Sequence, residues 1–250
     1  AIVRAMKGPK GDWWLTQLPE VQGAFVAMDP RNGELRALVG GFDYGRNKFN
    51  HVTQAWRQPG SSFKPFIYSA ALEKGFTPAT IVNDAPVVVD PFLTGGQVWE
   101  PRNYDGKFEG PMKLRTGLAK SKNMISIRVL QSIGTQYAQD YVTRFGFDAD
   151  KHPPYLTMAL GAGSVTLWQM LRAYSVFANG GYKLEPYLVS RIVDDHGQVL
   201  AEAQPQLAGD ESLRGIDARN AFIMDNMMRD VGRYGDRKST RLNSSHGYIS

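Results

Sequence analysis

Two residues of the sequence, Ser61 and Lys64, have the types and the spacing of a nucleophile with its base. They follow a Gln-Pro-Gly stretch at residues 58–60 and open an apolar run, which is typical of a helix start. Residues three apart on a helix share a face, so the lysine amine can reach the serine hydroxyl. A serine hydroxyl needs such a base, and burial lowers a lysine pKa enough to provide one. The alternative is a plain helix cap, because Ser-x-x-Lys also occurs by chance.

A second polar group, Ser121-Lys122-Asn123, interrupts two helical patterns further along the chain. Alternate side chains in such a break can project into one cleft. There the hydroxyl of Ser121 could relay a proton, and the amide of Asn123 could bind a substrate carbonyl or hold Lys64. Ser121 could equally cap the N-terminus of the helix that follows, and the two roles can coexist.

The composition removes several other classes of function. Without cysteine the chain has no disulfide and no thiol nucleophile, and its four histidines lack metal-ligand spacing. We therefore expect no metal and no cofactor. The net charge of +5 comes from scattered Lys and Arg, which does not favour nucleic-acid binding. No apolar stretch approaches the roughly 20 residues that cross a bilayer.

The pattern along the chain predicts a mixture of hairpins and helices. Apolar runs at residues 24–28 and 35–39, joined by Asp-Pro-Arg-Asn-Gly, predict an antiparallel hairpin, and a second hairpin has its tip at residues 195–197. Residues 83–110 are rich in Asn, Asp, Pro and Gly and predict a long surface excursion. Apolar spacing of helical period marks residues 61–74, 113–119, 123–133, 137–145, a stretch capped by Ser164 or Thr166 that ends before Asn179, and 217–228.

The two polar groups resemble the first two active-site motifs of the penicillin-binding proteins. Residues 37–84, 99–123 and 160–181 are also similar to the transpeptidase domain of the bifunctional class A enzymes, and the likeness runs from about Gln17 to Gly235. The resemblance implies an α/β (α+β) fold of the penicillin-binding transpeptidase and serine β-lactamase type, with an antiparallel sheet flanked by helices.

The resemblance also implies a role for each motif residue. Ser61 would be acylated by the penultimate D-Ala of a peptidoglycan stem peptide, and equally by a β-lactam, and its backbone N–H would form half of an oxyanion hole. Lys64 would be the base, Ser121 would shuttle the proton, and Asn123 would bind substrate and Lys64. Ser62 is a poorer candidate nucleophile, because the residue three positions after it is Pro65.

Two further groups of residues have suggested roles. Trp99, Tyr104 and Phe108 could line a cleft for the acceptor peptide, although aromatic residues in a long loop are as often packing plugs. Three methionines near the C-terminus, Met224, Met227 and Met228, are expected in the core.

The sequence departs from the family near its end. The third motif, Lys-Thr-Gly, is absent, and the nearest string is Lys238-Ser239-Thr240. Residues 236–246 resemble a conceptual translation of a sequencing adapter, so we interpret 236–250 as a foreign tail on a truncated gene. The strand that carries the third motif would follow residue 235, so the sheet is expected to be incomplete at its C-terminal end. Without that strand the sheet would expose an unpaired edge. We therefore expect this chain to be unstable and inactive in isolation.

These observations predict three segments and one activity. Residues 1–19 would be a connector from a missing upstream membrane helix and glycosyltransferase domain, and 20–235 the larger part of a transpeptidase domain. The expected function is peptidoglycan D,D-transpeptidation at the periplasmic face of the bacterial inner membrane, with membrane contact only through the missing segment. The alternatives are a D,D-carboxypeptidase or β-lactamase of the same superfamily, or a non-catalytic module that binds cell wall or β-lactams.

Overall fold

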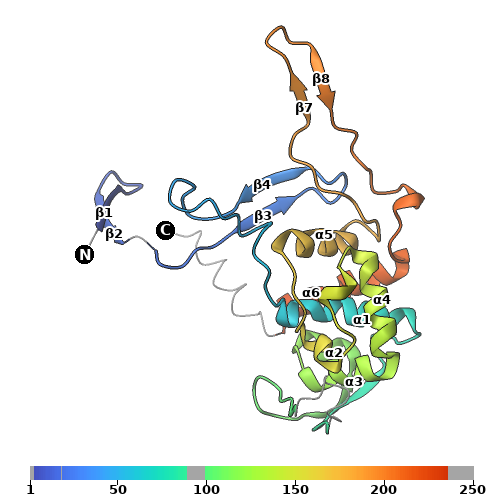
Figure 1. Cartoon of the computed structure of the whole chain (residues 1–250). Coiled ribbons are helices and arrows are strands. Elements are labelled where there is room, and N and C mark those ends of the chain that lie inside the picture. The colour runs from blue at the N-terminus through green and yellow to red at the C-terminus, as the bar shows by residue number, and fades with distance from the viewer. Residues whose placement is uncertain (1–2, 18, 89–98, 236–250) are drawn as a thin grey trace.

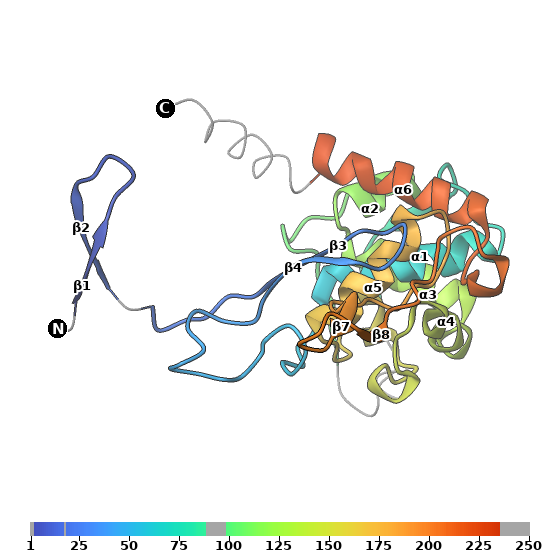
Figure 2. The same cartoon turned by 90° about the horizontal axis from the view of Figure 1, so that it is seen from above.

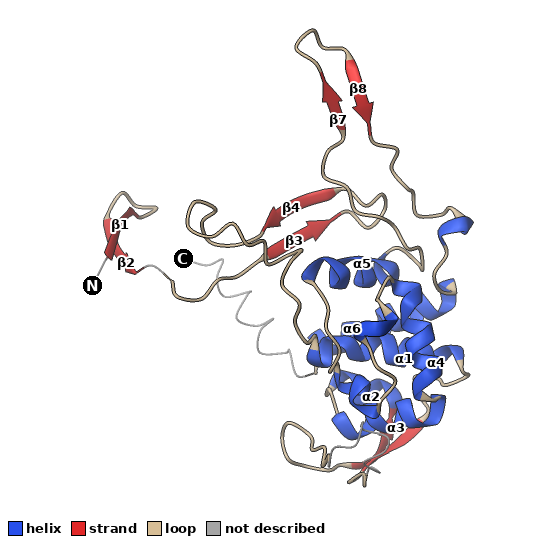
Figure 3. Cartoon of the chain, viewed as in Figure 1, coloured by secondary structure: helices blue, strands red, loops and turns tan. Residues whose placement is uncertain are grey.

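The computed structural model describes residues 3–17, 19–88 and 99–235 (Figure 1). The helices pack into one body, and the hairpin β3–β4 lies beside α5 at its edge (Figures 1 and 3). The helices are α1 (Lys64–Glu73), α2 (Leu114–Ala119), α3 (Asn123–Ile133), α4 (Thr135–Val142), α5 (Leu167–Ala178) and α6 (Ala218–Arg233).

All strands of the described residues pair antiparallel, in four two-stranded sheets. The pairs are β1 (Val3–Lys7) with β2 (Trp13–Gln17), β3 (Phe25–Met28) with β4 (Leu35–Val39), β5 (Ile81–Asp84) with β6 (Gly110–Lys113), and β7 (Arg191–Val193) with β8 (Val199–Glu202). The two hairpins expected from the sequence are therefore confirmed. Within the described part of the chain β3 and β4 pair only with each other. The β1–β2 hairpin stands away from the helical body (Figures 1 and 2), and β7–β8 projects from it (Figure 1).

The core is built around α1, whose residues from Lys64 to Ala71 are all buried. Its central ring, Phe66, lies within 5.6 Å, centroid to centroid, of five other aromatic rings, four of which are far from it in the sequence. These rings are Phe63, Phe145, Phe147, Tyr174 and Phe177. Truncating a buried Phe in such a cluster costs roughly 3–5 kcal/mol of stability. This packing therefore fixes α1, and with it the residues at the N-terminus of the helix.

The helical pattern predicts the elements well, with differences at the ends. The stretch predicted as one helix from residue 61 begins as a 3₁₀ turn, Gly60–Phe63, and becomes α-helical only at Lys64. The reason is Pro65, which has no N–H to donate to the carbonyl of Ser61, so the N–H of Lys64 donates there instead. A 3₁₀ turn, Thr143–Phe145, likewise completes α4, and α6 continues five residues past the predicted end at 228, to Arg233.

The start of α5 shows which of two predicted caps is used. Thr166, and not Ser164, is the N-cap: its Oγ1 accepts from Gln169 N at 3.2 Å, and Gln169 Oε1 accepts from Thr166 N at 3.1 Å. This reciprocal capping box fixes the direction of α5 beside α1.

The excursion between residues 84 and 110 is the loop of a long hairpin, because β5 and β6 pair at its two ends. It passes the N-terminus of α3, where the second polar motif lies. Residues 89–98 of the loop, and the predicted foreign tail 236–250, lie outside the described residues. In the described part of the chain no helix is long and apolar enough to cross a membrane.

Candidate active site

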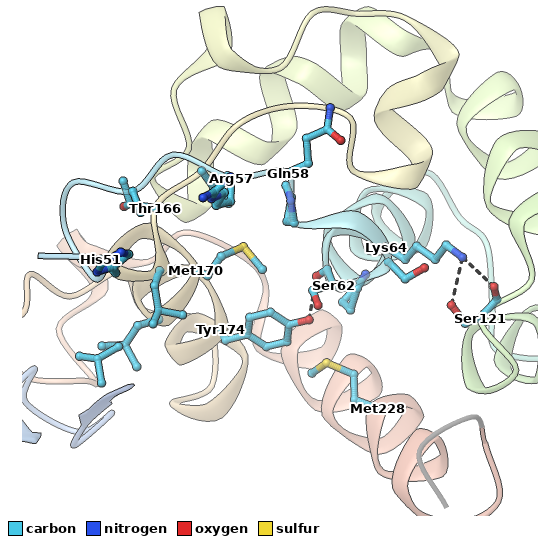
Figure 4. Close-up of a pocket in the computed structure, with 18 of the residues that line it drawn as sticks. His51, Arg57, Gln58, Ser62, Lys64, Ser121, Thr166, Met170, Tyr174 and Met228 are labelled. Carbon is cyan, nitrogen blue, oxygen red and sulfur yellow. Dashed lines mark hydrogen bonds between the residues drawn. The ribbon is translucent and has the colours of Figure 1, made fainter. Parts of the chain in front are cut away.

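A pocket of about 810 Å³ opens between the N-terminus of α1, the end of α2 and α5 (Figure 4). Ser61, Lys64 and Ser121 all line it, so the fold brings the two polar motifs of the sequence together. The remaining wall is largely apolar, with Met170 and Tyr174 from α5 and Met228 from α6.

The turn that carries Ser61 is held from two sides. Tyr174 on α5 donates its hydroxyl to the carbonyl of Ser62 at 2.8 Å (Figure 4). On the other side Arg57 and Val165 exchange both backbone hydrogen bonds at 2.9 Å, and Gly60 N donates to Gly161 O at 3.3 Å. Ser61 itself is exposed at the pocket, so its hydroxyl is accessible on an otherwise fixed backbone.

Lys64 extends from the first turn of α1 toward the second motif, and only 1% of its surface is exposed. Its Nζ donates to the carbonyl of Ser121 at 2.7 Å, to Ser121 Oγ at 3.1 Å and to Asn123 Oδ1 at 2.7 Å. These three acceptors are neutral. They hold the amine in one place, one helical turn after Ser61.

Ser121 has the left-handed backbone conformation, with φ of 54°. Its N–H donates to Leu118 O at 3.0 Å, and the N–H of Lys122 donates to Gly117 O at 2.9 Å. These two bonds form a Schellman motif at the end of α2, in which Ser121 occupies the position that usually belongs to glycine. The conformation turns the Ser121 carbonyl and hydroxyl toward Lys64.

The reading of Ser121 as the N-cap of α3 is wrong, because Ser121 ends α2 and the N-cap of α3 is Lys122. The side chain of Lys122 makes no capping hydrogen bond to α3. Asn103, from the loop between β5 and β6, instead accepts from the backbone N–H of Asn123. Asn123, the first residue of α3, donates its Nδ2 to Arg102 O at 2.7 Å, which leaves Oδ1 directed at Lys64.

None of the aromatic residues suggested for an acceptor cleft lines this pocket among the described residues. Trp99 is partly buried and packs against the hydrophobic core, and Tyr104 is fully exposed. Of the three methionines expected in the core, Met224 and Met227 are fully buried, and Met228 is half-buried at the pocket wall.

Sequence reasoning missed two residues that position the site. In the sequence, Tyr174 lies among the periodic apolar residues of its helix, and its hydroxyl is the one signal of a further role. Asn103 lies in an irregular loop, where no periodicity marks it. In the described part of the chain no set of three or more His, Asp or Glu side chains is arranged to hold a metal ion.

Comparisons with family models, known sequences and solved structures all point to the same family. The family model described as "Penicillin binding protein transpeptidase domain" matches residues 23–249. Penicillin-binding protein 1A of Neisseria lactamica is 49% identical over 235 residues, which are 94% of this chain and 29% of that protein. The chain therefore spans less than a third of the length of this relative.

Two solved structures agree. Penicillin-binding protein 1A from Haemophilus influenzae is similar with a TM-score of 0.86 and 36% identity, over 91% of this chain and 37% of that one. The PonA1 protein of Mycobacterium tuberculosis in complex with penicillin V is similar with a TM-score of 0.72 and 27% identity, over 86% of this chain and 58% of that one. With its mixed helices and antiparallel strands, the chain belongs to the penicillin-binding protein transpeptidase family, as a transpeptidase domain of the class A penicillin-binding protein 1A type.

Proposed function

We propose that this domain cross-links peptidoglycan as a D,D-transpeptidase, through an acyl-enzyme on Ser61. The observation that carries the proposal is the buried amine of Lys64, which Ser121 and Asn123 hold beside the pocket that Ser61 lines. A nucleophile, a base within one helical turn and a group that orients the base are the parts that covalent acyl transfer needs.

The proposed reaction has two steps. In the first, Lys64 acts as a neutral amine: it takes the hydroxyl proton as Ser61 Oγ attacks the carbonyl of the penultimate D-Ala, and the peptide bond breaks. The Ser121 hydroxyl, 3.1 Å from Lys64 Nζ, relays this proton to the departing D-Ala amine. In the second, the amine of an acceptor stem peptide attacks the Ser61 ester, which restores the serine hydroxyl and leaves a cross-linking amide.

A β-lactam would meet the same nucleophile. Attack by Ser61 opens the lactam ring and leaves an ester, with no leaving amine that can depart from the site. The related PonA1 protein of M. tuberculosis has been solved in complex with penicillin V, which supports this part of the proposal. Because stem peptides are exposed outside the cytoplasmic membrane, we place the domain at the periplasmic face of the inner membrane.

Fluorescent penicillin and intact-mass measurement test the acyl-enzyme. We expect an adduct of one penicillin per chain that disappears in Ser61→Ala and persists in the matched control Ser62→Ala. The sequence holds no Lys-Thr-Gly, and we expect this chain to be inactive in turnover, so labelling should be weak and needs long incubation. Strong labelling of the wild type would show that this expectation of inactivity is wrong. An unlabelled wild-type chain, or equal labelling of Ser61→Ala, would overturn the proposal.

Product analysis separates the transpeptidase from a hydrolase of the same superfamily. A D-Ala-D-Ala peptide is incubated with and without an amino acceptor. Transfer gives a new amide to the acceptor, whereas a D,D-carboxypeptidase gives only the shortened peptide and free D-Ala. A non-catalytic module would bind peptidoglycan equally well in wild type and Ser61→Ala, without either product.

A further inference from the structure

The loop between β5 and β6 places a fully satisfied polar side chain, Asn103, at the N-terminus of α3. Asn103 is 5% exposed. Its Nδ2 donates to Asp84 Oδ1 at 2.7 Å and to Lys107 O at 2.8 Å, and its Oδ1 accepts from Asn123 N at 2.8 Å and Met124 N at 3.4 Å. Because the two Nδ2 donors fix which way the amide faces, its oxygen must point at α3.

The α3 helix depends on this external cap. The first N–H groups of a helix have no partner within the helix, and a side chain at the N-cap usually accepts from one of them. Here the N-cap is Lys122, whose side chain has no acceptor atom and makes no capping bond. The position of Asn123, and of its Oδ1 on Lys64, is therefore tied to a residue in a different part of the chain.

A buried charge pair anchors Asn103 in turn. Asp84 is 0% exposed and Lys122 is 3% exposed, and their charged atoms lie 3.5 Å apart. The second oxygen of Asp84 also accepts from Glu109 N at 3.0 Å. Lys122 makes two further ion pairs, with Asp105 at 3.0 Å and Glu109 at 2.9 Å, so both flanks of the loop are fastened to the residue between Ser121 and Asn123.

We propose that Asn103 and Asp84 are positioning residues for acylation, which set where Asn123 and Ser121 hold the amine of Lys64. The inference rests on the proposed function of Ser61. Neither residue touches the nucleophile. They act through one chain of contacts, from Asp84 to Asn103, to the first N–H groups of α3, to Asn123 Oδ1 and to Lys64 Nζ. Since a misplacement of about 1 Å can lower a rate on the order of 100-fold, loss of the cap should act on the chemical step.

Penicillin acylation kinetics test the role, because they separate noncovalent binding from the acylation step. For Asn103→Ala we expect the maximal acylation rate constant to fall by roughly tenfold or more and the noncovalent dissociation constant to change less than about twofold. The matched control is Asn83→Ala, an exposed asparagine of β5 next to Asp84, which should equal wild type. Asp84→Asn keeps an oxygen for Asn103 and should lose less than Asn103→Ala.

A second measurement does not depend on acylation. In protein with ¹³C-labelled lysine, the Lys64 Cε signal is assigned by its absence in Lys64→Ala. Asn103→Ala should shift or broaden it, and Asn83→Ala should leave it unchanged. If the wild type acylates and Asn103→Ala acylates equally fast, the positioning role is overturned while the proposed function stands. If wild type does not acylate, the proposed function fails, and an unmoved Lys64 signal in Asn103→Ala then overturns the inference by itself.

Discussion

The imidazole of His152 stacks on the ring of Phe63, with centroids 4.6 Å apart and planes 15° apart. Phe63 ends the 3₁₀ turn that carries Ser61, so this histidine is part of the floor beneath the candidate nucleophile. His152 is 1% exposed, and neither of its ring nitrogens has a hydrogen-bond partner in the described residues. Burial lowers the pKa of His152 to about 4, although Asp148 and Asp150 act in the opposite direction.

The buried imidazole should make the fold acid-sensitive. Its pKa is about 4 when folded and about 6.5 when unfolded, so the unfolded chain binds the proton more readily between these values. This stabilisation is complete above pH 6.5 and is lost as the pH falls toward 4. Between pH 7.5 and pH 5 we expect a loss of about 2 kcal/mol in the free energy of unfolding from this group.

Urea unfolding at the two pH values measures this loss, and His152→Phe is the comparison because it keeps an aromatic ring against Phe63 and cannot titrate. The variant should lose about 2 kcal/mol less than wild type over the same range. Equal losses in the two proteins would assign the acid sensitivity to other groups.

Gly161 should not tolerate a side chain. Its φ is +70°, and a Cβ there would lie 2.2 Å from the backbone oxygen of Gly60, immediately before Ser61. Gly161→Ala should therefore cost more than the roughly 1 kcal/mol of left-handed backbone strain, and should slow acylation of Ser61 by displacing its turn. Gly75→Ala is the matched control, since Gly75 has φ of +90° and open space at its Cβ. Equal unfolding free energies for the two variants would contradict the close approach.

Ser121 combines backbone strain with a hydroxyl that Lys64 contacts, and two substitutions separate these properties. Ser121→Gly should relieve the strain at φ of 54° and raise stability by up to about 1 kcal/mol, while Ser121→Ala keeps the strain. Both remove the hydroxyl, so both should lower the acylation rate by roughly 100-fold if it relays the proton. Thermal unfolding and penicillin labelling of the two variants check these expectations. If Ser121→Gly is acylated as fast as the wild type, the hydroxyl has no part in the mechanism.

Local spacing was enough to identify the residues that the structure brings together. Ser61 and Lys64 are three apart on what becomes the start of one helix, and Ser121 and Asn123 flank a break between two others. Each of these motifs is contained in a stretch of only a few consecutive residues. The hairpin at residues 25–39 and the helices were predictable for the same reason, because turn residues and apolar periodicity are local properties.

Contacts between distant residues could not be predicted in this way. The capping of α3 by Asn103 joins residues 20 apart, and the bond from Tyr174 to Ser62 joins residues 112 apart. The sequence left open an N-cap role for Ser121 because serine favours that position, and only tertiary structure shows that it ends α2 in the left-handed conformation. The hairpin β1–β2 was read as a plain connector, although a turn rich in glycine, residues 8–11, separates its strands.

Two neighbouring lysines offer the last prediction, because both pair with Glu109 but only one is buried. Lys122 is 3% exposed and faces Asp84, Asp105 and Glu109. The side chain of Lys120 is 43% exposed and, within the described residues, forms an ion pair with Glu109 alone. Lys122→Met leaves the buried carboxylate of Asp84 without its cation, which should destabilise the fold by about 3–5 kcal/mol. Lys120→Met, as the matched control, should cost less than about 1 kcal/mol.

The pH dependence of stability should also differ between Lys122→Met and the wild type. Lys120 and Lys122 lower the pKa of Glu109, and hydrogen bonds from the Lys107 backbone and the Lys122 side chain lower that of Asp105. A carboxyl whose pKa is lowered on folding stabilises the protein above its unfolded pKa and loses that contribution as the pH falls. Lys122→Met removes one of the hydrogen bonds that lower each pKa, so its free energy of unfolding should fall less than that of wild type between pH 6 and pH 4. Parallel curves for Lys122→Met and wild type would show that the buried ammonium does not hold these carboxylates.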